Sequence, residues 1–294
     1  MTTEQPGSGP ASGPTVLRIL LGAQLRRLRE AKGITRDDAG YLIRSSDSKI
    51  SRMELGRVSF KERDVADLLT LYGITDDHER QALLGLARQA NTPGWWHRYG
   101  DLLPGWFQAY IGLEEAATLI RTFEVQFVPG LLQTEAYARA VITQGNPDAP
   151  AEEVERRVDL RRRRQQLLTR PAPDAPRLWA VVDEAALRRP IGGRPVLRGQ
   201  LERLVEATEL ANVTVQVLLF GVGGHAAEGG AFTVLRFAEP DLPDVVYVEQ
   251  LTSALYLDKP EDVDAYVAVM NRLDVESAPP RQTVEILNGI LKET

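Results

Sequence analysis

The segment ITRDDAGYLIRSSDSKISRMELGR, Ile34 to Arg57, decides the fold of the amino-terminal part of this chain. Thr35, followed three residues later by Asp38, is a variant of the capping box, in which a side-chain oxygen satisfies a free amide at a helix start. This pattern predicts a short helix over Arg36–Ile43.

A second helical pattern follows almost at once. Ser46 is the next candidate N-cap, and it predicts a helix that runs to Glu54, with Ile50 facing inward and Gly56 as the terminator. Only Arg44-Ser45 links the two helices. This spacing lets one helix brace the other while the second enters the major groove of DNA.

Helical patterns also flank this segment on both sides. Apolar residues recur at helical spacing in Val16–Lys32, where we expect Arg26, Arg27 and Arg29 on the other faces. Downstream, Ser59 and Glu62 form a full capping box for a fourth helix, and a fifth helix starts after Thr75 and ends near Ala90. Gly33 and Gly73 are expected helix stops. Five short helices in this order predict a compact all-α domain.

Charge is distributed unevenly along the chain. The 294 residues carry a net charge of -6, yet residues 15–72 hold twelve Lys or Arg against eight Asp or Glu, so this part is +4 and the remainder is -10. The pattern indicates a DNA-facing module joined to an acidic one. The chain contains no cysteine, has no signal-peptide pattern and has no apolar run of membrane-spanning length, so we expect a cytoplasmic protein without membrane contact.

A change of amino-acid composition marks the expected domain junction. Residues 91–105 are rich in Pro and Gly and include three aromatic residues, Trp95, Trp96 and Tyr99, which suggest that the junction is packed. We expect a disordered tail over residues 1–14, a helix-turn-helix domain over 15–92 and an α+β domain over 93–294.

The second half mixes the two types of pattern. Expected strands are bounded by Gly, Pro or Asp and rich in Val, Phe and Tyr; they are Leu178–Val182, Val213–Phe220, Phe232–Phe237 and Val245–Glu249. Expected helices are Ile111–Arg121, Gln133–Gln144, Glu152–Thr169, Val196–Leu210, Val263–Leu273 and Arg281–Lys292, with an extended stretch and turn over Phe123–Leu132.

The segment Ile34–Arg57 resembles the helix-turn-helix of the Xre/Cro/C1 repressor class, through its Thr cap, the small Ala39 and Gly40, Ile50 and the ending ISRMELGR. Arg44 departs from the pattern, because the family usually has Gly at this turn position, which often needs positive φ. The resemblance implies that the start of the second helix of this motif, the helix that follows Ser46, faces DNA. The candidate DNA-binding residues are Arg36, Ser46, Asp47, Ser48, Lys49, Ser51, Arg52 and Arg57.

These candidates divide by the chemistry of their side chains. Arg52 is the best base reader, because its forked donors match the acceptor pair of guanine. Lys49, Arg57 and Ser46 suit phosphate, and Arg36 would meet phosphate or a neighbouring base. Asp47 has two readings: it stabilises the start of the helix, which we favour, or it accepts a hydrogen bond from cytosine.

The remainder of the chain resembles a second family. The motifs are PGWW at Pro93–Trp96, FVPGLLQTEAYARAVI at Phe127–Ile142 and VVYVEQLTSALYLD at Val245–Asp258. They are similar to the carboxy-terminal, DUF5753-type domain of actinobacterial Xre-type regulators, which are called Scr1-family or antitoxin-like. The resemblance implies little chemistry, but such regulators are commonly paired with small acidic proteins.

Three further features of the sequence have both a functional and a purely structural interpretation. The loop GVGGHAAEGG, Gly221–Gly230, matches no phosphate-binding pattern and reads as a strand connection, with a ligand-pocket lip as the alternative. The three histidines lack metal-ligand spacing and no nucleophile motif is present, so we expect no metal, no cofactor and no catalytic residue. The run Arg161–Arg164 follows acidic residues on one helix, which the helix dipole favours; a second nucleic-acid patch is the alternative.

Together these patterns predict a transcriptional regulator that is not an enzyme. It binds double-stranded DNA as a homodimer, because such motifs usually read paired half-sites. A partner protein or a ligand controls it through the carboxy-terminal domain. The alternative is an antitoxin-like protein that mainly holds a small acidic partner and autoregulates its own operon, and an enzyme that uses the second domain ranks third.

Overall fold

The computed structural model describes residues 14–238 and 242–294, and it divides the chain into two compact units. Of these described residues, the first unit contains residues 14–97 and Ile111–Ala116, and the second contains Arg98–Tyr110 and the described residues from Ala117 to Thr294. Residues 1–13 of the expected tail lie outside the described residues, whereas Pro14 is already helical. The expected boundary between residues 92 and 93 stays a prediction.

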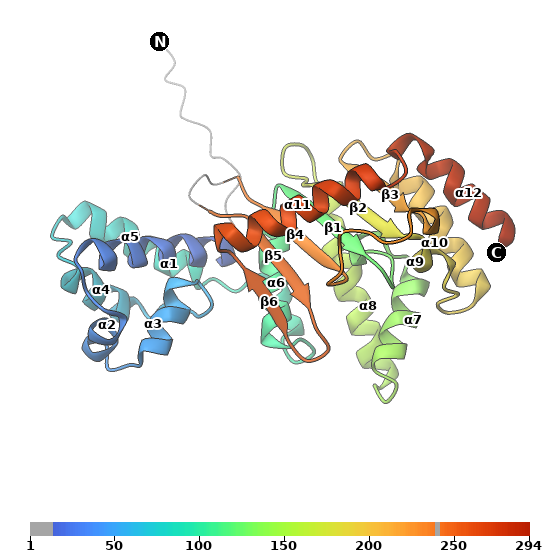
Figure 1. Ribbon diagram of the computed structural model, residues 1–294. Coiled ribbons are helices and arrows are strands. Elements are labelled where there is room, and N and C mark those ends of the chain that lie inside the picture. The colour runs from blue at the N-terminus through green and yellow to red at the C-terminus, as the bar shows by residue number, and fades with distance from the viewer. Residues whose placement is uncertain (1–13, 239–241) are drawn as a thin grey trace, which may run out of the picture. The chain divides into compact units, whose positions relative to one another are not determined.

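The first unit contains the five expected helices (Figure 1). They are α1 (Pro14–Ala31), α2 (Arg36–Leu42), α3 (Asp47–Glu54), α4 (Glu62–Leu71) and α5 (Asp77–Ala90). Their inward faces share one core that includes Leu25, Ile50, Leu68 and Ala87. The expected stops Gly33, Gly56 and Gly73 all have positive φ, between 64° and 75°, a conformation that glycine adopts without steric cost.

Two expected helix starts in this unit are wrong. Helix α4 begins at Glu62 after Lys61, so Ser59 is not its cap and no side chain caps it. The preceding backbone is satisfied otherwise, because Phe60 donates its amide to Asn91 Oδ1 at 2.9 Å and accepts from Asn91 Nδ2. Helix α5 is capped one residue later than expected, by Asp76, whose Oδ1 accepts from the amide of Glu79 at 2.7 Å.

The aromatic residues after α5 are packed within their own units. Trp96 is buried in the first unit, where a Cβ on Gly112 would collide with the Thr15 side chain and lie 3.0 Å from the Trp96 ring. Glycine at position 112 therefore permits a close approach. In the second unit, buried Tyr99 donates its hydroxyl to Asp159.

The second unit is built on a six-stranded mixed sheet with the order β3-β2-β1-β4-β5-β6. The strands are β1 (Leu119–Glu124), β2 (Arg177–Asp183), β3 (Val213–Leu218), β4 (Phe232–Arg236), β5 (Val245–Glu249) and β6 (Ala254–Leu257). Strands β1, β2 and β3 are parallel, and β4, β5 and β6 are added antiparallel. The α+β class expected for this part is confirmed.

Helices surround this sheet (Figure 1). They are α6 (Gly105–Ala116), α7 (Glu135–Gly145), α8 (Ala151–Gln165), α9 (Glu184–Arg188), α10 (Arg194–Ala207), α11 (Pro260–Glu276) and α12 (Thr283–Glu293). Helix α11 covers one face of the sheet, where its Met270 and Leu273 share a core with Phe123 and Val246. The opposite face carries Thr122 and Glu124 of β1, because side chains alternate along a strand.

The largest error in the second unit concerns Ile111–Arg121. The helix ends at Ala116, and Leu119–Glu124 is strand β1, near the middle of the sheet. A mixed stretch as short as residues 119–121 has no decisive period of its own. Its strand neighbours are β2 and β4, which lie far along the chain. Strand β6 was not expected, and the expected strand Val213–Phe220 ends two residues earlier, at Leu218.

Candidate nucleic-acid interface

The turn between α2 and α3 has the capped geometry expected from the sequence. Thr35 Oγ1 accepts from the amide of Asp38 at 3.1 Å, and Ser46 Oγ accepts from the amide of Lys49 at 3.3 Å. Gly40 allows the two helices to meet, because a Cβ there would lie 2.9 Å from the carbonyl oxygen of Ser45. The two helices are therefore fixed at short range by backbone contacts.

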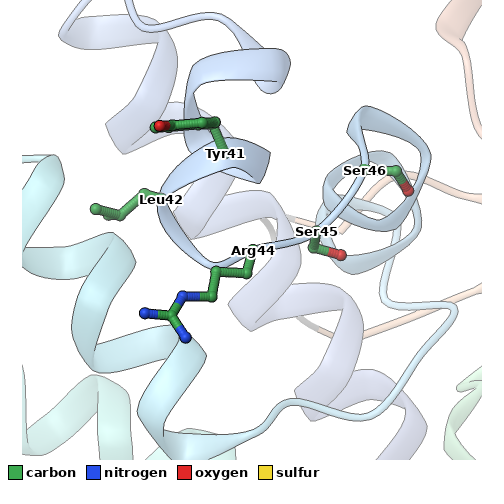
Figure 2. A pocket seen from close by; sticks show the side chains of 5 residues that line it. All are labelled: Tyr41, Leu42, Arg44, Ser45 and Ser46. Carbon is green, nitrogen blue, oxygen red and sulfur yellow. The ribbon is translucent and has the colours of Figure 1, made fainter.

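Arg44 occupies the left-handed region in this turn, with φ of 54°, and among the described residues it is the one non-glycine residue with positive φ. The family's usual glycine would adopt this conformation at lower cost, by about 1 kcal/mol. Figure 2 shows Arg44 projecting from the turn beside a hollow that Tyr41, Leu42, Ser45 and Ser46 also line. The expected positive φ is confirmed, with an exposed cation in place of glycine.

Helix α3 has one buried and one exposed face. Ile50, Met53 and Glu54 are buried, at the i, i+3 and i+4 spacing of a single helical face. Ser48 and Arg52 are exposed on the opposite side, and Arg52 Nε donates to the carbonyl oxygen of Ser48 at 3.3 Å. Arg52 thus lies along the exposed surface of α3, within reach of a ligand that would compete for its donors.

Two ion pairs hold α3 against the other helices. Arg29 of α1 donates through Nε and Nη2 to the two oxygens of Glu54, at 2.5 and 3.0 Å, and donates through Nη1 to the carbonyl oxygen of Ile34 at 2.9 Å. Lys49 Nζ lies 2.7 Å from Oδ2 of Asp64 on α4, which is 3% exposed. The expectation that Arg29 lies on an outer face is wrong, because its guanidinium is buried against Glu54.

The other predicted site residues lie around the exposed face of α3. Arg36 Nε is 3.3 Å from Asp47 Oδ1, and both side chains are about half exposed. Ser46 and Arg57 are exposed at the two ends of α3, whereas Ser51 is half-buried at its side. Of the eight predicted residues, Ser48 and Arg52 thus lie on the face of α3 opposite the core, whereas Lys49 is tied to α4 by its ion pair with Asp64.

Two residues on this surface were not singled out as candidates. Tyr41 is 87% exposed and Leu42 is 43% exposed, although both are apolar in character and lie at the end of α2 (Figure 2). The helical pattern over Arg36–Ile43 contained the signal, because only Ala39, Gly40 and Ile43 in this stretch are buried. An exposed tyrosine beside Arg44 gives the turn a second polar group that points to solvent.

Two weaker sequence features receive structural explanations in the second unit. Gly221–Gly230 connects β3 to β4, as expected, and His225 packs edge-on against Phe123 with its Nδ1 accepting from the amide of Ala227 at 3.2 Å. In the run Arg161–Arg164, Arg164 is buried and lies over the rings of Phe107 and Tyr110. A surface patch for nucleic acid needs exposed cations, so this run is not such a patch as a whole.

Comparison with known families agrees with this geometry. Residues 20–83 match a helix-turn-helix domain, which spans α2 and α3, and residues 107–289 match a domain of unknown function, DUF5753. No curated protein and no solved structure matches the chain. Within residues 14–238 and 242–294, no helix is long and apolar enough to cross a membrane. The second match covers more than half of the chain, which therefore belongs to the DUF5753 family and carries an amino-terminal helix-turn-helix domain of the kind found in DNA-binding regulators.

Proposed function

We propose that this protein is a sequence-specific DNA-binding transcriptional regulator, and not an enzyme, whose α3 reads bases in the major groove. The observation that carries the proposal is the exposed face of α3, with Ser48 and Arg52, on a helix whose other face is fixed by two ion pairs. A reading helix must hold its side chains at fixed positions relative to base edges, and rigid support provides this.

The surrounding polar residues supply phosphate contacts in this proposal. Ser46, Lys49 and Arg57 flank the reading face, and Arg36 lies beside its start. We add Arg44 to this group, because its exposed guanidinium projects from the turn that precedes α3 (Figure 2). Asp47 has Arg36 as its partner, which supports a role in ordering the start of α3 over direct contact with cytosine.

The remaining parts of the proposal concern assembly and control. We propose that the protein acts as a cytoplasmic homodimer on paired half-sites, and that a ligand or a small acidic partner protein controls it through the DUF5753 domain. The separation of the chain into two compact units supports this division of tasks. An antitoxin-like role predicts a stable complex with a small acidic protein that co-purifies, and a regulator controlled by a ligand does not require one.

The experiment begins with selection of binding sites from a randomised duplex pool by the full-length protein. The selected duplex and a scrambled duplex are then titrated with wild type and with Arg52→Ala. Loss of one bidentate base contact should weaken binding to the selected site by about 1 to 3 kcal/mol and leave the scrambled site nearly unchanged. The matched control is Arg88→Ala, which removes an exposed arginine of α5 and should leave both affinities as they are.

The outcomes separate the parts of the proposal. An equal loss for both duplexes would move Arg52 from base reading to phosphate contact, and unchanged binding in Arg52→Ala would remove α3 as the reader. Failure to select any sequence would contradict sequence-specific recognition altogether. The mass of the protein bound to the selected duplex, measured by light scattering, decides whether two copies bind each site.

A further inference from the structure

A cavity of about 550 Å³ that opens to solvent lies in the second unit, on the face of the sheet opposite α11. Its floor is formed by strand residues that share this face: Thr233 is paired with Tyr247 across β4 and β5, and Glu249 is two residues further along β5. Glu124, two residues after Thr122 on β1, faces the same space. All of the residues that line this cavity belong to the second unit.

Aromatic rings form one wall of the cavity. Tyr110 of α6 lies against Tyr247, with ring centroids 4.2 Å apart, and stacks on Phe107 at 5.7 Å. Arg164 of α8 lies over the Phe107 and Tyr110 rings, at 5.2 and 5.5 Å. The guanidinium is already in contact with aromatic faces, which is a favourable place for a buried cation.

Hydrogen bonds fix the opposite wall, the segment that follows β1. Gln133 is buried and donates to the carbonyl oxygen of Val128 at 2.7 Å, while Arg161 donates to Gln133 Oε1. Gln165 of α8 donates to the carbonyl oxygens of Gly130 and Gln133, at 3.0 and 2.7 Å. The cavity is therefore preformed, as small-molecule sites usually are.

Some polar groups of the cavity have hydrogen-bond partners in the protein, and one does not. Glu249 accepts from the Tyr247 hydroxyl at 2.8 Å, and both arginines have protein partners. The Glu124 carboxyl has no hydrogen bond or ion pair with any residue in 14–238 or 242–294. Burial, with the nearby Glu249 charge as a second cause, raises the pKa of Glu124 to about 8, and Arg161 opposes the shift. Glu124 is half-buried and no protein donor matches its carboxyl, so a ligand that supplies a donor, preferably a cationic one, can pair with it.

We propose that this cavity is a binding site for a small organic cation, a primary amine with an apolar or aromatic body, whose ammonium group is held between Glu124 and Glu249. The rings of Tyr110 and Tyr247 and the side chain of Phe127 contact the body of the ligand. Glu124 ends β1 and the exposed Glu249 ends β5, on either side of β4, and both carboxylates line the same cavity. This site goes beyond the proposed function, because it exists whether or not the protein binds DNA.

An anionic ligand fits the same cavity less well. Arg164 is 6% exposed and lies over two rings, and Arg161 is bonded to Gln133, so a carboxylate or phosphate would have to break existing contacts. It would also lie close to two carboxyl groups. A cation meets the opposite situation, because it supplies the missing donor and leaves the arginine contacts intact.

Proton release follows from this geometry. The charged groups that face Glu124 are Glu249 of β5 and Arg161 and Arg164 of α8, with the hydroxyls of Tyr247 and of Tyr137 on α7 nearby. In the empty cavity Glu124 keeps its proton at pH 7, because its pKa is about 8. A bound ammonium favours the ionised carboxylate, so binding expels a proton, and affinity should rise up to about tenfold per pH unit until pH 8.

The test uses three probes with the same phenyl body and different heads: phenethylamine, phenethyl alcohol and 3-phenylpropionate. Each is titrated into the full-length protein by calorimetry at pH 6, 7 and 8, in two buffers of different ionisation enthalpy. The amine should bind at least tenfold more tightly than the alcohol and release close to one proton at pH 7. A primary alkylamine stays protonated up to about pH 9, so the pH dependence reports on the protein.

Three substitutions connect the binding to the carboxyl groups. Glu124→Gln keeps the shape of the side chain and should remove both the preference for the amine and the proton release. Glu249→Gln should weaken amine binding and also shift the pH midpoint down, because one cause of the raised pKa of Glu124 is lost. The matched control, Glu285→Gln on exposed α12, should behave as wild type.

Each remaining outcome overturns the proposal. Tightest binding of 3-phenylpropionate would show that the arginines recognise an anion, and equal binding of all three probes would show an apolar cavity without a cation site. Absence of binding by every probe at 10 mM, or unchanged amine binding in Glu124→Gln, would remove the site. None of these results depends on DNA, so a failure here leaves the assignment of α3 as the reader to its own test.

Discussion

Two sites with acidic side chains, one in each unit, differ in how their carboxyl groups are matched. In the helix-turn-helix unit, Arg29 is matched by both oxygens of Glu54, and the carboxylate of Asp64 is matched by Lys49. In the second unit, Glu124 faces a cavity without a matching partner among the described residues. A matched buried pair fixes geometry, and an unmatched group leaves free energy available for a ligand. The comparison distinguishes a region that matched charges hold rigid from a cavity that we propose binds a small cation.

The strongest test of the rigid side is Glu54→Ala, which leaves the Arg29 guanidinium buried without its partner. Breaking one partner of a buried pair should destabilise the first unit by about 3 to 5 kcal/mol. Denaturant unfolding of the full-length protein, followed by a probe in the first unit, measures the change. The control is Glu62→Ala, whose pair with Arg88 is half exposed and should contribute less than about 1 kcal/mol. Similar losses in both variants would contradict the distinction between buried and exposed pairs.

Lys49 and Asp64 provide the next test, because Lys49 has both a structural and a DNA-binding assignment. Asp64→Ala removes a nearly buried carboxylate that ties α3 to α4, and it should cost about 1 to 3 kcal/mol of stability. Lys49→Ala should cost a similar amount, and it should also reduce the log-log salt slope of DNA binding by about one if the ammonium meets phosphate. Salt titrations decide, since an unchanged slope would leave Lys49 with the structural role alone.

Glu124 should make the stability of the second unit depend on pH. Its carboxyl keeps its proton in the folded protein up to a pKa of about 8, whereas the ordinary value is 4.5. Between these values unfolding releases a proton, so stability falls as pH rises. Glu124→Gln should remove this dependence and be more stable than wild type at pH 8 by up to about 4 kcal/mol, with the difference gone near pH 4. Thermal unfolding across this range measures it, and parallel curves would contradict the raised pKa.

The smallest expected effect compares one helix cap from each unit. Thr35 caps α2 and Thr134 caps α7, and each side chain accepts from the amide three residues later, at 3.1 and 3.2 Å. Replacement of either by Ala should cost about 1 kcal/mol in its own unit. Hydrogen exchange at the capped amides of Asp38 and Tyr137 reports each loss separately. A loss in one unit that also speeds exchange in the other would show that the units unfold together.

Structural features that depend on neighbouring residues were predicted better than features that depend on residues far apart in the sequence. Several features depend only on neighbours within a few residues, and short sequence patterns were therefore enough to predict them. They are the caps Thr35 and Ser46, the positive φ at Arg44 and the glycine stops. Burial of Arg29 depends on Glu54, 25 residues away, and the sequence alone makes that arginine look like a surface residue. The first half of strand β1, residues 119–121, was assigned to a helix for the same reason, because the partners β2 and β4 decide the conformation of β1.

The candidate sites divide along the same line. The eight residues proposed to contact DNA come from one continuous segment, so a single motif was enough to select them. The cavity carboxyls come from β1 and β5, and no spacing rule connects them. Arg161 and Arg164 were singled out as a charged run, yet their role as a cavity wall depends on the fold of α6, α8 and the segment after β1.

Helix α6 limits how this architecture can be rearranged. Its first residues, up to Tyr110, belong to the second unit, and its last residues, from Ile111, belong to the first, where Gly112 makes room for Thr15 and Trp96. A gene fusion that exchanged the chain after His97 would carry this helix away and expose the Trp96 ring. The two units are therefore not interchangeable modules. A folded chimera must contain an α6 whose last residues pack against its own helix-turn-helix unit.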